Sequence, residues 1–428
     1  MRKMRAFVVS PVYPPEPIVS SQTSTQLVEE LMRRGHQVTV ITAFPSKPAG
    51  KLYAGYRRRL MERQRTKAGL DVVRCFSFLS TESRMASRLL ENLSFGVTSS
   101  LALLVARRPD VIYANTWPIV ATGLVNLVAH LRRIPMVISV QDVYPESLVS
   151  QRRLGANHLL IRAMRWLDQM IARNCQEIIV ISESFASVYR NRRHIPTDRV
   201  HYVPNWGDHT AIIPGDERAS FFRASHNIPE HAFVVMYGGN VGMAARVEVV
   251  VEAFHYLQTS QDIYLVIAGD GSSLATCRQL ANQLDVQRII FHSPWLSAET
   301  SMALSAADVL VLPTRGEQSL ASVPSKLITY LFAAKPVIAL ALPESDLARS
   351  IERAGCGWVI APDQPELLAD QIRVALDTVI GERDRLGQRG RAFALQHFSS
   401  EVCLSQIMNV ISRAASAGGW SHESYGSR

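Results

Sequence analysis

The sequence has few cysteines and no long apolar run, and both shortages narrow what the protein can be. Its cysteines are odd in number and scattered along the chain, at Cys75, Cys175, Cys277, Cys356 and Cys403. This argues against a disulfide framework and a zinc ribbon, and favours a reducing compartment. No stretch reaches the roughly 18 apolar residues of a spanning helix, and the N-terminal residues lack the apolar run of a signal peptide. We therefore expect a cytoplasmic protein.

Acidic residues are scarce in the first half of the chain. Residues 1–205 hold 29 Lys and Arg against 14 Asp and Glu, a balance of +15, whereas residues 206–428 hold 17 against 23, a balance of −6. Arginine clusters lie at Arg57–Arg59 with Arg63 and Arg65, at Arg107 and Arg108, at Arg132 and Arg133, at Arg152 and Arg153, and between Arg190 and Arg193. Such a surface suits nucleic acid, anionic lipid or a phosphorylated substrate. Nucleic acid is the weakest of the three because aromatic residues do not alternate with these arginines.

The pattern of apolar runs predicts an α/β fold with two doubly wound parallel sheets. At 428 residues, 47% of them hydrophobic, the chain can build two or three domains with sizeable cores. Wholly apolar runs separated by helical patterns indicate parallel strands covered on both faces. In the first half these runs are 6–10, 38–42, 72–74, 111–113, 136–140 and 178–181, and in the second half 233–237, 263–268, 289–291, 309–312 and 337–340.

The pause around Val203–Gly207 divides the chain. We expect one Rossmann-like domain over residues 1–205 and a second over 206–395, with a ligand cleft between the strand ends of the two. A C-terminal helix over 396–415 would cross back to the first domain, and 416–428 would form a flexible tail.

A helix preceded by Pro and Ser carries a lysine in its first turn. Pro324 and Ser325 suit the start of a helix, and Lys326 follows them. A first-turn lysine opposes the helix dipole, so an anion bound there would explain it. The competing interpretation is a solvated lysine at an ordinary helix start.

Other loops of the second half could line the same edge. Gly239, Asn240 and Val241 follow one predicted strand, and Gly269 and Gly271 follow the next; glycines let backbone amides approach a phosphate, although simple tight turns explain the second loop equally well. Further candidates at strand ends are His292, Ser293, Arg315 and Glu317. His292 fits a structural histidine better than a catalytic one. Arg315 and Lys326 are our candidates for binding a diphosphate.

Two loops of the first half are candidates for the second substrate. A proline-rich loop containing Pro15 leads to the small pair Ser20 and Ser21, which would let a substrate approach closely. Asp142 and Tyr144 follow a predicted strand. The Asp142 carboxylate could act as a base, hydrogen-bond a sugar hydroxyl or cap the next helix.

Taken in order, these motifs resemble glycosyltransferase family 4. They are Tyr13–Pro17, Arg34–Val40, Asp142–Ser147, Pro204–Trp206, Gly239–Gly242, Ala268–Gly271 and the helix at Pro324–Lys326. The resemblance covers about residues 1–412, and it is closest to the fucosyl- and N-acetylfucosaminyl-type transferases of bacterial exopolysaccharide and O-antigen assembly. It implies the GT-B fold.

The resemblance also implies an activity. The enzyme would transfer a sugar, with retention of configuration and without a metal or other cofactor, from a UDP-, GDP- or dTDP-linked donor to a lipid-linked saccharide. The catalytic candidates are Asp142, Lys326 and Arg315. The donor would contact the second domain through Gly239, Asn240, Val241, Gly269, Gly271, His292, Ser293, Glu317, Pro324, Ser325, Lys326 and Thr329. The acceptor would meet Pro15, Ser20, Ser21, Asp142 and Tyr144, with the basic half against the anionic inner face of the plasma membrane.

The sequence departs from the family pattern at several positions. Asn240 and Ala245 stand where many members have an arginine and a lysine, and Ala321 and Thr329 replace a pair of glutamates. Gln141 replaces a histidine before Asp142, and Ala334 replaces a glycine near the end of the Pro-Ser-Lys helix. Lys326 and Arg315 would then have to neutralise the diphosphate.

These departures keep alternatives open. A degenerate, non-catalytic GT-B protein is one, and an epimerase-like or phosphorylase-like GT-B enzyme is another. A dehydrogenase is disfavoured because the chain has no Gly-x-Gly-x-x-Gly with a downstream acidic residue. The helical pattern of Leu89–Ala106 is a further candidate for membrane contact, although burial in the core explains it better.

Overall fold

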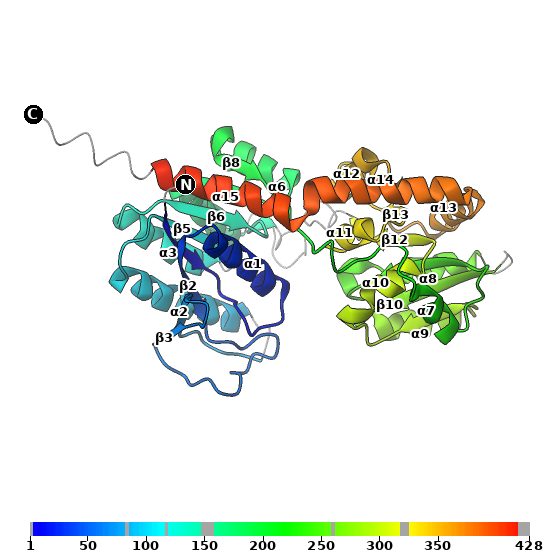
Figure 1. The fold of residues 1–428 in the computed structure, drawn as a ribbon, viewed down its shortest axis with the longest axis horizontal. Coiled ribbons are helices and arrows are strands. Elements are labelled where there is room, and N and C mark those ends of the chain that lie inside the picture. The colour runs from blue at the N-terminus through cyan, green and yellow to red at the C-terminus, as the bar shows by residue number, and fades with distance from the viewer. Residues whose placement is uncertain are drawn as a thin grey trace, which may run out of the picture. The chain divides into compact units, whose positions relative to one another are not determined.

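The chain forms two compact units, each built around its own sheet (Figure 1). The first comprises Met1–Val203 and Leu404–Arg428, and the second comprises Pro204–Cys403. The structure, a computed structural model, describes residues 3–81, 85–115, 119–146, 158–257, 262–316 and 325–417. The predicted α/β class with two parallel sheets is confirmed.

The sheet of the first unit has the strand order β3-β4-β2-β1-β5-β6-β7-β8. Its strands are β1 (Arg5–Val9), β2 (Gln37–Ala43), β3 (Met61–Arg65), β4 (Asp71–Cys75), β5 (Val111–Asn115), β6 (Met136–Val140), β7 (Glu177–Val180) and β8 (Val200–Tyr202). All pair in parallel except β3, which runs antiparallel to β4 at the edge. The strand order reverses beside β1, between β2 and β5. In open α/β sheets ligands bind at the carboxyl ends of the strands next to such a reversal.

Helices cover both faces of this sheet. They are α1 (Val19–Arg33), α2 (Met85–Val105), α3 (Ile119–Leu131), α5 (Leu159–Asn174), α6 (Glu183–Ser187) and the C-terminal α15 (Ser400–Ala417), which begins in the second unit. The inner sides of α2, α3 and α5 share one hydrophobic core with β1, β5, β6 and β7. The bond from Arg413 of α15 to the carboxylate of Glu177 in β7, at 3.0 Å, ties the last helix to this unit.

The sheet of the second unit is parallel throughout, with the order β11-β10-β9-β12-β13-β14. Its strands are β9 (Phe233–Gly238), β10 (Ile263–Ala268), β11 (Ile289–His292), β12 (Val309–Pro313), β13 (Val337–Leu340) and β14 (Gly357–Ile360). Successive residues of β9 enter two different cores, one on each face of the sheet. This explains why the strand is apolar at every position. Here the order reverses between β9 and β12.

Seven helices of eight or more residues belong to the described part of this unit or start in it. They are α8 (Glu248–His255), α9 (Leu274–Gln283), α11 (Ser325–Phe332), α12 (Asp346–Ala354), α13 (Pro365–Asp377), α14 (Ile380–Phe398) and α15; the shorter helices are α7 (Ala219–Ser225) and α10 (Thr300–Ser305). Local sequence explains several ends: Ser345 caps α12 through the N–H of Ala348, and Gly355 ends it with a φ of 55°. Pro365 occupies the first turn of α13.

Two expectations from the sequence need correction. Arg193, counted among the surface arginine clusters, is fully buried. The Leu89–Ala106 region, expected to be core, is core on one side only: Phe95, Ala102 and Leu103 are buried, whereas the other side of α2 is exposed. Among the described helices, none has the length and apolar character needed to cross a membrane. All five cysteines are free and buried.

Candidate functional site

Two glycine loops interlock at the carboxyl edge of the second sheet. The loop after β9 and the loop after β10 are joined by the N–H of Gly239 to the carbonyl of Ala268 and by the N–H of Val241 to the carbonyl of Asp270, both 2.8 Å. A Cβ on Gly269 would lie 1.9 Å from the Gly239 carbonyl oxygen, and one on Gly271 would lie 2.3 Å from the Val241 oxygen. Both positions therefore require glycine.

Lys326 lies across the first of these loops. It occupies the first turn of α11, and its alkyl chain is so close to Gly239 that a Cβ there would be 2.3 Å from Cε of the lysine. Its Nζ stands 5.6 Å from the ring centroid of Tyr237, in the range of a cation–π contact. The described residues place no carboxylate within ion-pair distance of this Nζ. Burial lowers the pKa of Lys326, so its charge is held at a partly desolvated place that suits an anion.

One tyrosine fixes the position of α11 against β9, and a second holds the loop that follows β9. The hydroxyl of Tyr330 accepts the N–H of Gly238 at 2.7 Å and donates to the carbonyl of the same residue at 3.0 Å. The hydroxyl of Tyr237 donates to the carbonyl of Asn240 at 2.6 Å. The first turn of α11 is thereby set over the glycine loop, with the bonds supplied by side chains that the sequence alone did not single out.

The other predicted donor residues are distributed around this edge. Thr329 is half-buried one turn after Lys326, and Ser325 is exposed at the start of α11. Arg315 is half-buried and follows β12, which pairs with β9 at the point where the strand order reverses. Glu317 and Pro324 lie outside the described residues.

His292 is held by protein partners on both ring nitrogens. Its Nδ1 is 3.2 Å from Nε2 of His226, and its Nε2 is 3.1 Å from the carboxylate of Glu299. Its backbone carbonyl accepts the N–H of Gly269 at 2.9 Å. The next residue, Ser293, donates its hydroxyl to the carboxylate of Asp270. The third loop is thus tied to the second, and the ring of His292 has a structural role.

The basic residue nearest the first glycine loop in sequence is already paired. Arg246, next to Ala245, has a φ of 50° and lies 2.7 Å from Asp363, with Glu248 and Glu252 within 4 Å. This guanidinium is neutralised inside the protein. Among the described residues of this edge, that leaves Lys326 and Arg315 as the basic groups for a ligand.

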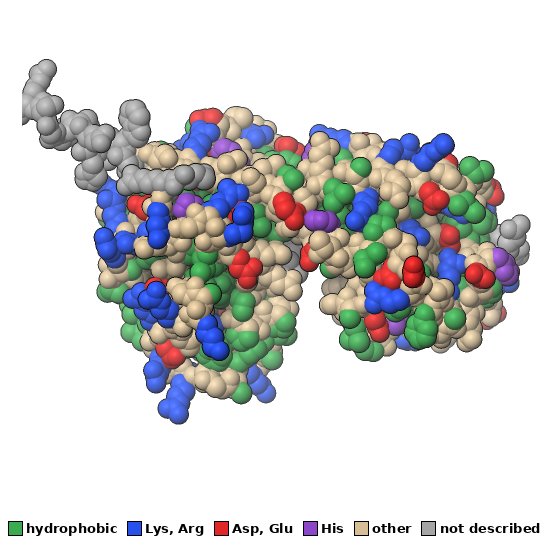
Figure 2. Space-filling model, in the orientation of Figure 1, with side chains coloured by type: hydrophobic (Ala, Val, Ile, Leu, Met, Phe, Trp, Pro, Cys, Tyr) green, Lys and Arg blue, Asp and Glu red, His purple; other side chains and the backbone are tan. Residues whose placement is uncertain are grey.

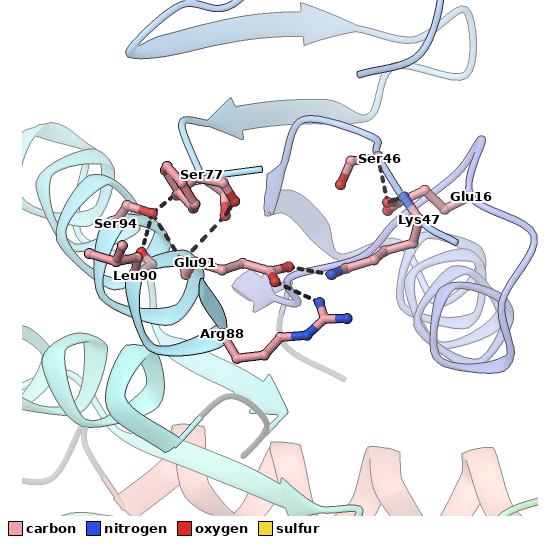
Figure 3. A network of polar contacts seen from close by, with 9 residues as sticks. Glu16, Ser46, Lys47, Ser77, Arg88, Leu90, Glu91 and Ser94 are labelled. Carbon is pink, nitrogen blue, oxygen red and sulfur yellow. Dashed lines mark hydrogen bonds and ion pairs between the residues drawn. The ribbon is translucent and has the colours of Figure 1, made fainter. Parts of the chain in front are cut away.

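A polar network occupies the carboxyl edge of the first sheet (Figure 3). Glu16 is 3% exposed, and its carboxylate accepts the N–H groups of Ser46 at 2.9 Å, Lys47 at 2.8 Å and Tyr13 at 3.3 Å. Burial raises the pKa of Glu16, although its three N–H partners act in the opposite direction. These bonds join the loop after β1 to the loop after β2.

The same network continues onto α2 and borders a small pocket. The ammonium of Lys47 lies 2.5 Å from the carboxylate of Glu91, whose other oxygen accepts from Arg88 at 2.8 Å. The pocket is lined by Pro11, Val12, Glu16, Ala43, Ser46, Lys47, Ser77, Glu91, Asn92 and Phe95. The sequence did not indicate that Glu16, Lys47 and Glu91 form a group, because they are 31 to 75 positions apart and only the fold brings them together. The proline-rich loop itself was the signal, and Glu16 stands within it.

The Asp142 loop is anchored by the buried Arg193. Its guanidinium donates to the carboxylate of Glu146 at 2.7 and 3.0 Å, to the carbonyl of Tyr144 at 3.2 Å and to the carboxylate of Asp168 at 2.7 Å. Burial alone would lower the pKa of Arg193, but the two carboxylates raise it. Burial raises the pKa of Asp168, against the effect of the arginine. Asp142 itself is half-buried directly after β6.

The remaining acceptor-side candidates have different environments. Pro15 and Ser20 are exposed, whereas Ser21 is 1% exposed and its hydroxyl has no hydrogen-bond partner among the described atoms. The structure thus groups Gly239, Asn240, Val241 and Lys326 with the second glycine loop, while the first unit groups its candidates around the ends of β1 and β6. The described residues contain no group of three His, Cys, Asp or Glu side chains placed to hold a metal ion.

Comparisons with known proteins identify the family of the chain. Residues 20–206 match the model of a glycosyl transferase 4-like domain, and residues 219–393 match that of the glycosyl transferases group 1. The "Putative colanic acid biosynthesis glycosyl transferase WcaI" of Escherichia coli (strain K12) is 26% identical over 423 residues, covering 95% of this chain and all of the relative. The "Probable glycosyltransferase WbjE" of Pseudomonas aeruginosa is 26% identical over 338 residues, covering 78% and 82%.

Solved structures share the fold at lower identity. Sucrose-phosphate synthase from Thermosynechococcus elongatus superposes with a TM-score of 0.73 at 18% identity, covering 97% of this chain and 100% of that one. Anabaena HepE, in complex with UDP and glucose, has a TM-score of 0.69 at 14% identity, with coverage of 96% and 99%.

Proposed function

Because the chain is a GT-B glycosyltransferase, built from a glycosyl transferase 4-like domain and a domain of the glycosyl transferases group 1, we propose that it moves a sugar from a nucleotide-sugar donor to a lipid-linked saccharide in bacterial cell-surface polysaccharide synthesis. The name of WcaI supports the process, and the name of WbjE supports the activity. The observation that carries the donor assignment is the position of Lys326 over the glycine loop.

The donor diphosphate binds at the carboxyl edge of the second sheet in this proposal. Backbone amides of Gly239 to Val241 and the first turn of α11 supply neutral donors, and Lys326 and Arg315 supply positive charge. A nucleotide donor is supported by the structure of HepE with UDP and glucose. UDP, GDP and dTDP remain the three candidate nucleotides for this chain.

Transfer proceeds with retention and without a metal ion. As the bond to the sugar breaks, negative charge grows on the leaving diphosphate, and a fixed ammonium stabilises that charge more than the charge of the ground state. The leaving phosphate can take the proton of the attacking hydroxyl on the same face of the sugar, so a strong enzymic base is not required. Asp142 then orients the acceptor hydroxyl, held in place by the anchored loop from Gln141 to Glu146.

The acceptor binds to the first unit. The ends of β1, β2 and β6 there carry buried hydroxyls, the carboxylate of Glu16 and the half-buried Asp142, which are groups that can bind the hydroxyls of a saccharide. The balance of +15 over residues 1–205 favours a diphospholipid-linked acceptor at the inner face of the plasma membrane.

A thermal-shift screen of the full chain against UDP, GDP, dTDP and their sugars tests this function. A ligand at 100 times its Kd adds about 2.7 kcal/mol, enough to raise Tm by several degrees. We expect one nucleotide to give that increase and the Lys326→Met variant to lose it. A uniform lack of response to all three nucleotides would favour a degenerate GT-B protein.

A further inference from the structure

The helix α2 exposes aliphatic side chains from its second turn to its end. Leu89, Leu93, Val97, Leu101 and Leu104 succeed one another at intervals of three or four residues and are 53%, 44%, 45%, 40% and 48% exposed. That spacing places them on one side of the helix. The opposite side, with Phe95, Ala102 and Leu103, packs in the core. A row of exposed aliphatic side chains from Leu89 to Leu104 needs an explanation, because leaving apolar side chains in water is unfavourable.

Two neighbouring helices extend the row into a surface. A Cβ on Gly96 of α2 would be 2.8 Å from Cα of Ala121 in α3, and one on Gly123 of α3 would be 3.3 Å from the Leu167 side chain of α5, so the three helices lie side by side. We call their exposed apolar side chains the apolar helix surface: Leu89, Leu90, Leu93, Val97, Leu101, Leu104, Val105, Leu127, Leu131, Leu159, Leu160, Trp166 and Met170. Figure 2 shows hydrophobic side chains at the surface of this unit with Lys and Arg beside them.

Apart from ion-paired acidic residues, the charge carried by these three helices is positive. The three helices contain only two acidic residues, Glu91 and Asp168, and both are paired, with Lys47 and Arg193 respectively. Exposed arginines border the surface at Arg107, Arg108, Arg133, Arg162 and Arg173. An apolar helix face edged by arginine is the composition of segments that lie in the interface of an anionic bilayer. A second copy of this chain would instead bring two positively charged borders together, which disfavours pairing.

We propose that the apolar helix surface docks into an anionic bilayer, with α2 lying in the plane of the interface. This inference deepens the proposed function by naming the surface through which the enzyme reaches a lipid-linked acceptor. Leu89, Leu93, Val97 and Leu101 enter the boundary between headgroups and acyl chains, and the arginines contact the lipid phosphates.

Docking in this way would bring the pocket of the first unit to headgroup depth. Leu89, Leu90 and Leu93 lie on the exposed side of α2, while Glu91 and Asn92, between them, line the pocket next to Lys47. One turn of the helix therefore presents leucines outward and polar side chains to the pocket. A phospholipid-linked sugar has the same order of parts, an apolar tail followed by a polar head.

Vesicle flotation of the full chain tests the proposal. Wild-type protein is expected to float with vesicles of phosphatidylglycerol and phosphatidylcholine and to stay at the bottom with phosphatidylcholine alone. The double substitution Leu93→Glu, Leu101→Glu should weaken binding by at least about tenfold per leucine. Arg107→Gln combined with Arg162→Gln should weaken it by roughly fivefold per arginine and reduce its dependence on anionic lipid.

The matched control lies on α13 of the other unit. Leu367 and Val374 are 47% and 51% exposed. The pair Leu367→Glu, Val374→Glu therefore makes the same change of charge at similarly exposed positions, and this variant should float like the wild type. The Tm and the shape of the melting curve report folding, and the shift of Tm by UDP, GDP or dTDP reports donor binding. Both are measured without lipid. Failure of the proposed function would remove that shift and leave flotation intact.

Two results would overturn the docking proposal. One is flotation of the Leu93→Glu, Leu101→Glu variant at the wild-type level. The other is a wild-type protein that fails to float and forms a concentration-dependent dimer by light scattering, together with a variant that stays monomeric. The apolar helix surface would then be a contact between copies.

Discussion

Gly239 and Lys326 are in such close contact that the first residue has no room for a side chain: a Cβ on Gly239 would lie 2.3 Å from Cε and 2.8 Å from Cδ of the lysine. The φ of Gly239, 140°, is also one that other residues rarely adopt. The glycine therefore permits the loop conformation and the path of the lysine together.

Gly239→Ala is expected to displace the lysine and strain the loop. We expect it to lower the free energy of unfolding by about 1–3 kcal/mol and to abolish the nucleotide-dependent rise in Tm. Gly381→Ala is the control, because a Cβ there meets nothing within 4 Å and the residue lies in helix α14; it should be neutral or stabilising. A Gly239→Ala protein with normal nucleotide response would show that the lysine path is unimportant.

Lys326→Met should raise Tm in the absence of nucleotide while removing the response to it. Burial lowers the folded-state pKa of Lys326 below 10.5. Between the lowered pKa of the folded protein and the 10.5 of the unfolded chain, the unfolded chain binds more protons. The contribution of this lysine to stability is therefore unfavourable below the folded-state pKa and becomes less so as the pH rises to 10.5. Methionine removes the buried charge and this pH dependence, with a gain of up to a few degrees.

Lys335 provides the control for that substitution. Burial lowers its pKa as well, and it lies beyond the other end of α11, so Lys335→Met alters a buried lysine away from the glycine loops. Its nucleotide response should persist. If Lys335→Met lost the response as fully as Lys326→Met, the phosphate role of Lys326 would be contradicted.

Asp142→Asn should reduce sugar transfer more than donor binding. The substitution keeps the size of the side chain and removes its charge at the proposed acceptor site. We expect transfer of radiolabelled sugar from the donor to butanol-extractable lipid to fall at least about tenfold, with the Kd for the donor unchanged by calorimetry. A weakened donor Kd would assign Asp142 to the other substrate.

Arg193→Met should destabilise the first unit strongly. It leaves the buried Asp168 without its cation and removes the closer of the two arginines beside Glu146; breaking such a buried pair costs about 3–5 kcal/mol. Urea unfolding measures the loss. Arg192→Met, at the exposed neighbouring position, should change the stability by less than about 0.5 kcal/mol, and equal effects of the two substitutions would refute the anchoring role.

Ala334→Gly is expected to stabilise the second unit. Ala334 follows α11 with a φ of 54°, a left-handed conformation that costs a residue with a Cβ about 1–2 kcal/mol. Part of the gain is lost to the greater freedom of glycine in the unfolded chain, so we expect a net 0.5–1 kcal/mol, roughly, by urea unfolding. Ala333→Gly, one position earlier without a positive φ, should have the opposite sign.

The sequence predicts the strands best where burial on both faces makes them apolar throughout. The bounds of β6, β10 and β13 agree with the predicted runs at both ends. The strand β3, Met61–Arg65, was not predicted because an exposed antiparallel edge strand carries polar residues at most positions. The short edge strands β8 and β14 were missed for a related reason, since few of their residues are fully buried.

Periodicity also left the environment of α2 undecided. Apolar residues at intervals of three and four indicate a helix with an apolar side, but the same spacing arises whether that side meets the core or a membrane. In α2 both sides are apolar, and only the three-dimensional packing tells which one is covered. The contacts of Glu16 and Arg193 could not be predicted for a different reason. Glu16 bonds to Ser46 and Lys47, 30 and 31 residues away, and the partners of Arg193 in its own loop network are 25 to 49 residues away.

The interlocked glycine loops restrict how the sequence of this enzyme can vary. Gly269 is limited by the carbonyl of Gly239, and Gly271 by that of Val241, so a larger residue in the second loop is tolerated only if the first loop moves, which in turn shifts Lys326. Substitutions in the two loops should therefore be non-additive. In directed evolution toward another donor, we expect useful changes to appear as coordinated pairs in these loops, or outside them altogether.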